Sequence, residues 1–353
     1  MSFASAFKVK NAPLGQVYKI NRFYTCIIVC LSLIIIACLL GIFIGSSDIE
    51  PSRIIAALTG EGGKFETIVV WQLRIPRFLV GLTGGIALAL SGLIMQSILR
   101  NPLASPELTG VSMGTAIFVV ASIVFFPSVS ALWHPAIGLI GGFIAGGFVL
   151  TVSLSRSDGT LGLILGGVAI SAFCAAGVMI ILKGFAPFAQ PAYIWLIGAI
   201  AGRGMMHLYV MLPWVSLGLI VLFIARRPMY LLSLGDDTAQ SMGLNVVFWR
   251  SALLFAALSM TAGVVSIAGP IAFIGLSAPH IARLIIKKSE NLIVSTALIG
   301  ACLMVFSDWV ARIIASPREI PVGLFLALIG APLFIHLIRS SNLLSQEKRG
   351  RIE

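Results

Sequence analysis

Long apolar runs with few charges constrain this chain more than any other sequence feature. A helix that crosses a bilayer needs about 20 predominantly apolar residues. Because lipid offers the backbone no hydrogen-bond partners, many such runs in one chain indicate a bundle of membrane-spanning helices. We therefore predict an all-α integral membrane protein with about ten transmembrane helices. The predicted spans are Tyr24–Gly45, Phe78–Ile98, Val111–Pro127, Ala136–Leu154, Leu161–Leu182, His207–Ala225, Ser251–Ile267, Ile271–Ile286, Leu292–Ala315 and Pro321–Ile338.

The bulk composition agrees with this reading and argues against a soluble enzyme. Hydrophobic residues make up 58% of the chain and charged residues only 10%, whereas a soluble domain has about 25% charged residues. The net charge of +11 comes from basic residues placed between the apolar runs. They form no single stripe with interleaved aromatic residues, so the charge does not indicate nucleic-acid binding.

The distribution of Lys and Arg predicts the orientation in the membrane. If the N-terminus is cytoplasmic and all ten runs cross, inside segments hold 16 of the 24 basic residues and outside segments hold 8. Basic residues collect in cytoplasmic loops, so we expect both termini inside. The predicted domains are an N-terminal tail over residues 1–23, one transmembrane domain over 24–338 and a C-terminal tail over 339–353.

Glycine and proline predict how the bundle is packed and interrupted. Paired glycines, as at 84–85 and 141–142, allow close helix contacts in lipid. Segments 268–279 and 316–323 are rich in Gly and Pro and are expected to break helices where a cavity is lined. The apolar run Ala192–Ala201 is too short to span and is expected to form a half-helix or an interfacial helix.

The sequence offers little catalytic or ion-coupling chemistry. Asp308 is the one acid inside an apolar run, and we expect it to pair with Arg312 four residues later. The segment 60–65 lacks the spacing of a phosphate-binding loop, and the four histidines are scattered without metal-site spacing. We predict that the chain is not an enzyme, holds no metal and binds no cofactor. A carrier driven by an ion gradient and a polytopic membrane enzyme are the alternatives.

The longest polar interior loop, residues 226–250, contains a predicted short helix. Asp236 and Asp237 are placed to cap its N-terminus, Ala239 and Met242 give it an apolar side, and Gly243 is placed to end it. The pattern by itself fits an ordinary amphipathic loop helix and a docking element for a soluble partner equally well.

Four stretches of the chain resemble the FecCD-type permeases of iron-siderophore, haem and cobalamin ABC importers. The first runs from Arg74-Ile-Pro-Arg77 to Arg100-Asn-Pro-Leu-Ala-Ser-Pro106, and the second covers Gly235–Gly243. The third comprises Ala268–Gly275 and Pro279–Arg283, and the fourth runs from Asp308 through Glu319–Gly323 to Pro332. The resemblance implies ten helices in halves related by a pseudo-twofold axis. It also implies a bacterial inner-membrane importer subunit, with a ferric siderophore as the expected cargo and haem or cobalamin as alternatives.

The resemblance also implies partners and roles for individual residues. The partners are a second permease subunit (the same chain or a paralogue), two subunits that bind and hydrolyse ATP, and a substrate-binding protein on the outer face. Residues implied to dock the binding protein are Arg74, Arg77 and Arg312. Residues implied to couple to the ATPase are Gly235, Asp236, Asp237, Ala239 and Gly243. Residues implied to form a gate or line the pathway are Ser157, Thr160, Pro270, Pro279 and His280.

Overall fold

The computed structural model describes residues 14–45, 49–130, 132–154, 159–185, 189–286, 291–316 and 318–332, and this part of the chain is helical and contains no strand. The predicted all-α fold is therefore confirmed. The elements are α1 (Leu14–Phe43), α2 (Pro51–Thr59), α3 (Lys64–Ile68), the π-helical turn η1 (Val69–Arg74), α4 (Ile75–Leu99), the 3-10 turn η2 (Pro106–Thr109), α5 (Val111–Phe125), α6 (His134–Leu154), α7 (Gly159–Gly184), α8 (Gln190–Leu196), α9 (Met205–Ile224), α10 (Arg226–Leu234), α11 (Asp236–Ser241), α12 (Val246–Ala268), α13 (Ile274–Ile285), α14 (Leu292–Ile314) and a last helix over Val322–Pro332.

Each predicted span coincides with a helix within the described residues, and positions 333–338 of the span predicted as Pro321–Ile338 lie outside them. Two helices differ from expectation in length. Within the described ranges, six helical stretches are long and apolar enough to cross a membrane, and three shorter apolar helices accompany them. The helix α13 has only 12 residues, or about 18 Å of rise, and cannot cross alone. The extended segment 269–273 precedes α13. This segment and the helix together cover the stretch predicted as the span Ile271–Ile286. The helix α1 begins at Leu14, inside the segment predicted to be a tail.

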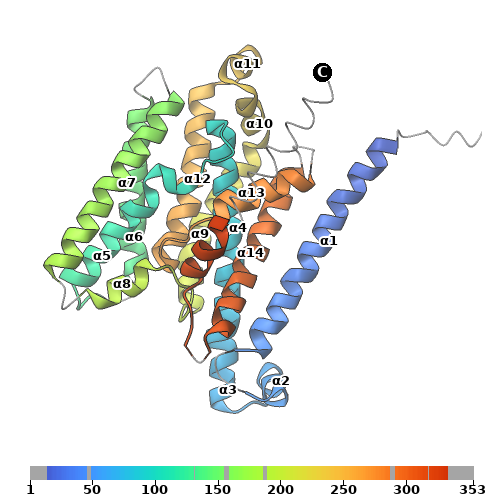
Figure 1. Ribbon diagram of the computed structural model, residues 1–353, viewed down its shortest axis with the longest axis vertical. Helices are drawn as coiled ribbons and strands as arrows, with labels where there is room; N and C mark the ends of the chain where they lie inside the picture. The colour runs from blue at the N-terminus through green and yellow to red at the C-terminus, as the bar shows by residue number, and fades with distance from the viewer. Residues whose placement is uncertain are drawn as a thin grey trace, which may run out of the picture.

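The bundle is built around α4 and α12, which lie side by side at its centre (Figure 1). Most residues of both helices are buried. The helices α13 and α14 pack against α4, and α5, α6 and α9 pack against α12. The outermost helices are α1 and α7, which expose most of their apolar side chains. Such surfaces fit contact with lipid or with another membrane subunit.

The two ends of the bundle differ in structure. One end carries α2 and α3, and the other carries α10 and α11 (Figure 1). At the first end, α3, η1 and α4 form one continuous helix that includes the π turn. The turn lies just before Pro76, which lacks the N–H that a regular helix would bond to the residue four positions earlier. The wider turn therefore accommodates the proline while the helix continues.

Glycines bring the central helices into backbone contact. A Cβ on Gly92 of α4 would lie 1.8 Å from the carbonyl oxygen of Gly275 in α13, and one on Gly85 would lie 2.4 Å from that of Gly300 in α14. The helices α5 and α6 meet in the same way at Gly114 and Gly141. The predicted small-residue packing is therefore confirmed for the 84–85 and 141–142 pairs.

The interrupted helices satisfy each other's backbone groups. Gly269 and Phe273, at φ of +75° and +71°, bound the extended segment after α12. The amide of Ala199, just after α8, donates to the carbonyl of Ala268 at 2.7 Å, and the amide of Gly323 donates to Gly198 at 2.9 Å. These bonds connect the end of α8, the end of α12 and the start of the last helix, and we call this place the junction of broken helices. They give backbone groups the hydrogen-bond partners that lipid cannot provide.

Glycine packing predicts that Gly92→Ala is destabilising. The added methyl group has no space against the Gly275 carbonyl, and such overpacking costs about 1–3 kcal/mol in free energy of unfolding. Gly147→Ala is the matched control, because a Cβ at this helical glycine would meet nothing within 4 Å. The midpoint of thermal unfolding of the detergent-purified protein should fall for the first variant only, and equal midpoints for the two would contradict the packing described.

Candidate functional site

A buried charge cluster lies at the end of the bundle that carries α2 and α3. Arg77 of α4 makes a two-point contact with Asp308 of α14, in which Nε donates to Oδ2 and Nη2 donates to Oδ1, both at 2.8 Å. Its Nη1 donates to Glu319 at 2.7 Å. The arginine thereby connects α4, α14 and the segment before the last helix. A two-point arginine–carboxylate contact is among the strongest charged hydrogen bonds in proteins.

The expected pairing of Asp308 with Arg312 is wrong. Asp308 faces Arg77 across the α4–α14 contact, whereas the Nη2 of Arg312 donates to the carbonyls of Gly41 and Ile44, both at 3.0 Å. Asp308 and Arg312 are four residues apart on α14, but the direction of each side chain decides which partner it contacts. The carboxylate obtains a planar two-point contact from α4 that an (i, i+4) pair on one helix would not supply.

Two arginines hold the end of α1. Arg74 donates to the carbonyl of Ile42, beside the carbonyls bound by Arg312. The last carbonyls of a helix lack partners within the helix, and cations near them also interact favourably with the helix dipole. A Cβ on Gly45 would lie 2.8 Å from the Arg74 guanidinium. The small residue thus lets the arginine reach the helix end.

The three arginines predicted to dock a binding protein are buried in this conformation. Arg74, Arg77 and Arg312 are 5%, 8% and 4% exposed, and each has partners within the chain. The bases Arg53, Lys64 and Arg318 are exposed at the same end of the bundle. The docking role of the three buried arginines stays a prediction. Glu319 also belongs to the cluster, and the sequence gives no predicted role for it. The presence of two acids, Asp308 and Glu319, beside the three arginines of the predicted docking set was the signal for a shared network of ion pairs.

The opposite end carries the predicted coupling element. The helices α10 and α11 are joined at Gly235, which has φ of +124°, and α11 ends before Gly243, which has φ of +78°. Ala239 is fully buried, and its carbonyl accepts from the amide of Leu244 at 3.0 Å. The predicted short helix and its glycine end are confirmed, and the coupling role of Gly235, Asp236, Asp237, Ala239 and Gly243 stays a prediction.

Asp236 does not cap the helix as expected. Both of its carboxylate oxygens accept from the Nη2 of Arg250 in α12 at 2.7 Å, and no side chain caps the start of α11. The backbone of Gly235 serves as N-cap, so the carboxylate is available to tie α11 to α12. The sequence gives Arg250 no predicted role, although it follows two acids by 13 and 14 positions in the same polar loop.

The surface around α11 is apolar where water is expected. Met242 is 63% exposed, and Leu234, Val247 and Phe248 are also exposed. We call these four residues the apolar end patch. Ala239 and Met242 were predicted to give this helix an apolar side, but Ala239 is buried whereas Met242 is exposed. Exposed apolar patches of this kind mark contacts with other proteins or with membrane.

The residues implied to form a gate are scattered or lie partly outside the described residues. Ser157 lies outside them, and Thr160 lies in the first turn of α7. Pro270 belongs to the junction of broken helices, where its carbonyl oxygen would lie 2.2 Å from a Cβ on Gly198. Pro279 is buried inside α13, and His280 beside it is partly buried. Their roles stay predictions. Among the described residues no group of three His, Cys, Asp or Glu is placed to hold a metal ion.

Comparisons with known proteins give one consistent result. Residues 33–340 match the FecCD transport family. The chain is 34% identical to the Fe(3+)-citrate import system permease protein YfmE of Bacillus subtilis, over 91% of this chain and 96% of that protein. It is 36% identical to the Fe(3+) dicitrate transport system permease protein FecD of Escherichia coli, over 79% and 87%. It is 35% identical to the vitamin B12 import system permease protein BtuC of Salmonella paratyphi A, over 88% and 93%.

A solved structure shares the architecture. It is an inward-facing conformation of a metal-chelate type ABC transporter, with 29% sequence identity and a TM-score of 0.79. The match covers 89% of this chain and 98% of that chain. The similarity therefore extends over most of the chain.

The charge cluster predicts a large stability loss for Arg77→Ala. The substitution leaves Asp308 and Glu319 without their shared partner, and breaking a buried ion pair costs about 3–5 kcal/mol. Arg77→Lys keeps the charge but not the two-point geometry, so we expect an intermediate loss. Thermal unfolding of the detergent-purified variants measures both effects.

The control for this series is Arg53→Ala. Arg53 pairs with Glu66 at 3.3 Å, but its side chain is 68% exposed, and exposed pairs contribute at most about 1 kcal/mol. A loss at position 77 no greater than that at position 53 would show that the buried cluster contributes nothing to stability.

Proposed function

Because the chain belongs to the FecCD transport family, we propose that it is the membrane permease subunit of an ATP-driven importer that carries a ferric chelate into the cell. The relatives that match it over most of their length are permeases for ferric citrate, siderophore, hydroxamate and vitamin B12. Iron chelates predominate among these cargoes, and this supports a ferric siderophore or citrate complex over cobalamin.

The observation that carries the proposal is the α10–α11 element with its apolar end patch. A short helix fixed to α12 by the Asp236–Arg250 contact presents Met242 and its apolar neighbours outward. This is the arrangement needed by a docking element that transmits motion from a soluble subunit. We place this end, with both chain termini, in the cytoplasm, in agreement with the Lys and Arg distribution.

The partners follow from this arrangement. Two ATPase subunits bind and hydrolyse ATP and engage α11, so this chain needs no cofactor of its own. A second permease, identical or paralogous, covers an apolar flank of the bundle. A substrate-binding protein docks at the end that carries α2 and α3. Arg74, Arg77 and Arg312 serve this docking when carboxylates of the binding protein replace or join their internal partners.

The buried cluster argues against an ion-driven carrier. A carrier of that kind needs an intramembrane acid that gains and loses a proton or a cation during transport. Asp308 is the acid available, and Arg77 already holds both of its oxygens at 2.8 Å. Binding and release of a transported ion at Asp308 would have to break both of these contacts. The geometry therefore favours a structural role for Asp308.

Transport by reconstituted complexes tests the proposal. The chain is co-expressed with the ATPase and binding-protein genes encoded beside it and placed in proteoliposomes. We expect accumulation of ⁵⁵Fe-citrate or a ⁵⁵Fe-siderophore that requires ATP, both partners and an intact permease. Uptake by the chain alone, driven by a proton or sodium gradient, would refute the importer assignment.

A single substitution tests the docking element. Met242→Glu places a charge on the apolar end patch, and we expect the amount of co-purified ATPase subunit to fall about tenfold, equivalent to about 1.4 kcal/mol of binding free energy. Met242 is largely exposed, so the fold should be retained. The control is Phe65→Glu, which charges an equally exposed apolar residue at the opposite end. Equal co-purification of the two variants would show that α11 is not the ATPase contact.

A further inference from the structure

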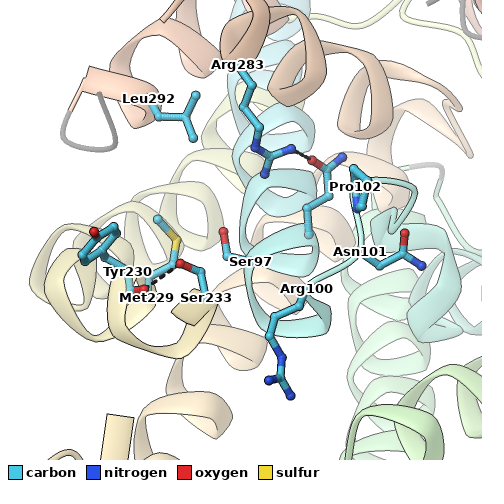
Figure 2. A pocket seen from close by; sticks show the side chains of 10 residues that line it. Ser97, Arg100, Asn101, Pro102, Met229, Tyr230, Ser233, Arg283 and Leu292 are labelled. Atoms are coloured by element: carbon cyan, nitrogen blue, oxygen red, sulfur yellow. Dashed lines mark hydrogen bonds between the residues drawn. The ribbon is translucent and has the colours of Figure 1, made fainter. Parts of the chain in front are cut away.

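A polar cavity of about 290 Å³ opens at the α10–α11 end of the bundle. It lies between the end of α4, α10, α13 and the first turn of α14 (Figure 2). Gln96, Ser97 and Arg100 come from α4 and its C-terminal cap, and Arg283 comes from α13. Figure 2 shows Ser97 between the two arginines, with Tyr230 and Ser233 on the facing side. The cavity therefore offers several hydrogen-bond donors to one bound group.

The cavity has a positive charge balance. Arg283 donates to the side-chain oxygen of Gln96, and among the described residues no acid lies within ion-pair distance of it. Arg100 lies 3.9 Å from Asp236, but that carboxylate already accepts both of its short contacts from Arg250. Arg100 and Arg250 thus share the Asp236 carboxylate, and Arg283 donates to an amide oxygen. An anion placed between Arg100 and Arg283 therefore gains electrostatic stabilisation.

An apolar groove of about 380 Å³ lies at the same end of the bundle. Its lining consists of the last turns of α9, from Leu219 to Ile224, together with Ile293 of α14. Consecutive residues of α14 contribute to the two spaces, since Leu292 lines the cavity and Ile293 lines the groove. The groove lies on the membrane side of α10, because α9 leads directly into α10 through Ala225. Arg226 lies over the Phe223 ring at 5.2 Å and marks the boundary between the apolar groove and the basic surface.

We propose that the cavity and groove together bind one anionic phospholipid, with the phosphate in the cavity beside Arg100 and Arg283 and an acyl chain along the groove. A basic pocket between transmembrane helices at a membrane surface is suited to anionic headgroups. The exposed side chains of Ile220, Phe223 and Ile224 face the position of the chain. The bound lipid would fill the space between α4 and α10, next to the element proposed to couple to the ATPase. A soluble anion would use the cavity only, and an acidic protein segment would leave the apolar groove unoccupied.

Lipid retention by the full-length purified chain tests this proposal. The protein is titrated with dioleoylphosphatidylglycerol or dioleoylphosphatidylcholine in detergent, and bound lipid is counted by native mass spectrometry. We expect one phosphatidylglycerol to be retained with higher affinity than phosphatidylcholine. A surface arginine contributes about 1 kcal/mol to anionic lipid binding, so we expect Arg100→Gln to weaken retention about fivefold and Arg100→Gln/Arg283→Gln by tenfold or more.

Two further variants keep the test decisive. Arg53→Gln removes an exposed charge at the opposite end and should retain phosphatidylglycerol as the wild type does. Ile220→Trp narrows the groove while leaving both arginines in place, and we expect weaker retention of phosphatidylglycerol. The single Arg100→Gln variant guards against misfolding, because that side chain is 43% exposed.

Three results would overturn the proposal. Equal retention of the two lipids by the wild type would remove the anionic preference. Unchanged retention in Arg100→Gln/Arg283→Gln, with loss of the co-purified ATPase subunit, would identify the cavity as a contact for an acidic protein segment. Weakened retention with arginine substitutions but not with Ile220→Trp would restrict the site to the anion and exclude the acyl-chain groove.

Discussion

The contact of Arg77 with Asp308 and Glu319 is the interaction on which the arrangement of the bundle most depends. Charges inside a membrane protein are costly unless they are paired, and this arginine pairs two carboxylates from the C-terminal part of the chain with the central helix α4. The neighbouring arginines then hold the end of α1 against the same region. A small set of buried charges thereby joins the first, second and last parts of a fold that otherwise relies on apolar packing.

The sequence predicts the number and position of the helices well because the bilayer imposes a minimum apolar length on each span. It predicts the short helix at 236–241 because glycine and acidic residues mark its ends. It does not predict which arginine holds Asp308, since Arg77 lies 231 residues away and only the packing of α4 on α14 brings the two together. The Gly and Pro content of 268–279 predicts the break between α12 and α13. The apolar composition does not predict that α13 is only 12 residues long, because it is the same for a helix and for an extended segment inside the protein.

The two ends of the molecule are organised for different tasks. At the end with α2 and α3, the arginines implied by the family resemblance are engaged with internal carboxylates and carbonyls. At the end with α11, charged contacts are used to fix a small helix, while apolar side chains remain outward. The resemblance assigns roles to residues at both ends, and the structure distinguishes residues with internal partners from residues that are exposed.

The glycine contacts between α4, α13 and α14 have a mechanical consequence. At Gly92 and Gly85 the helices touch through backbone atoms, so no side-chain rotamer is available to absorb sliding of one helix over another. Displacement would require the helices to separate, with loss of their packing. We therefore expect these three helices to travel as one rigid unit during a transport cycle. Bending is then expected where the backbone is already irregular, at Gly235, Gly243 and the 269–273 segment.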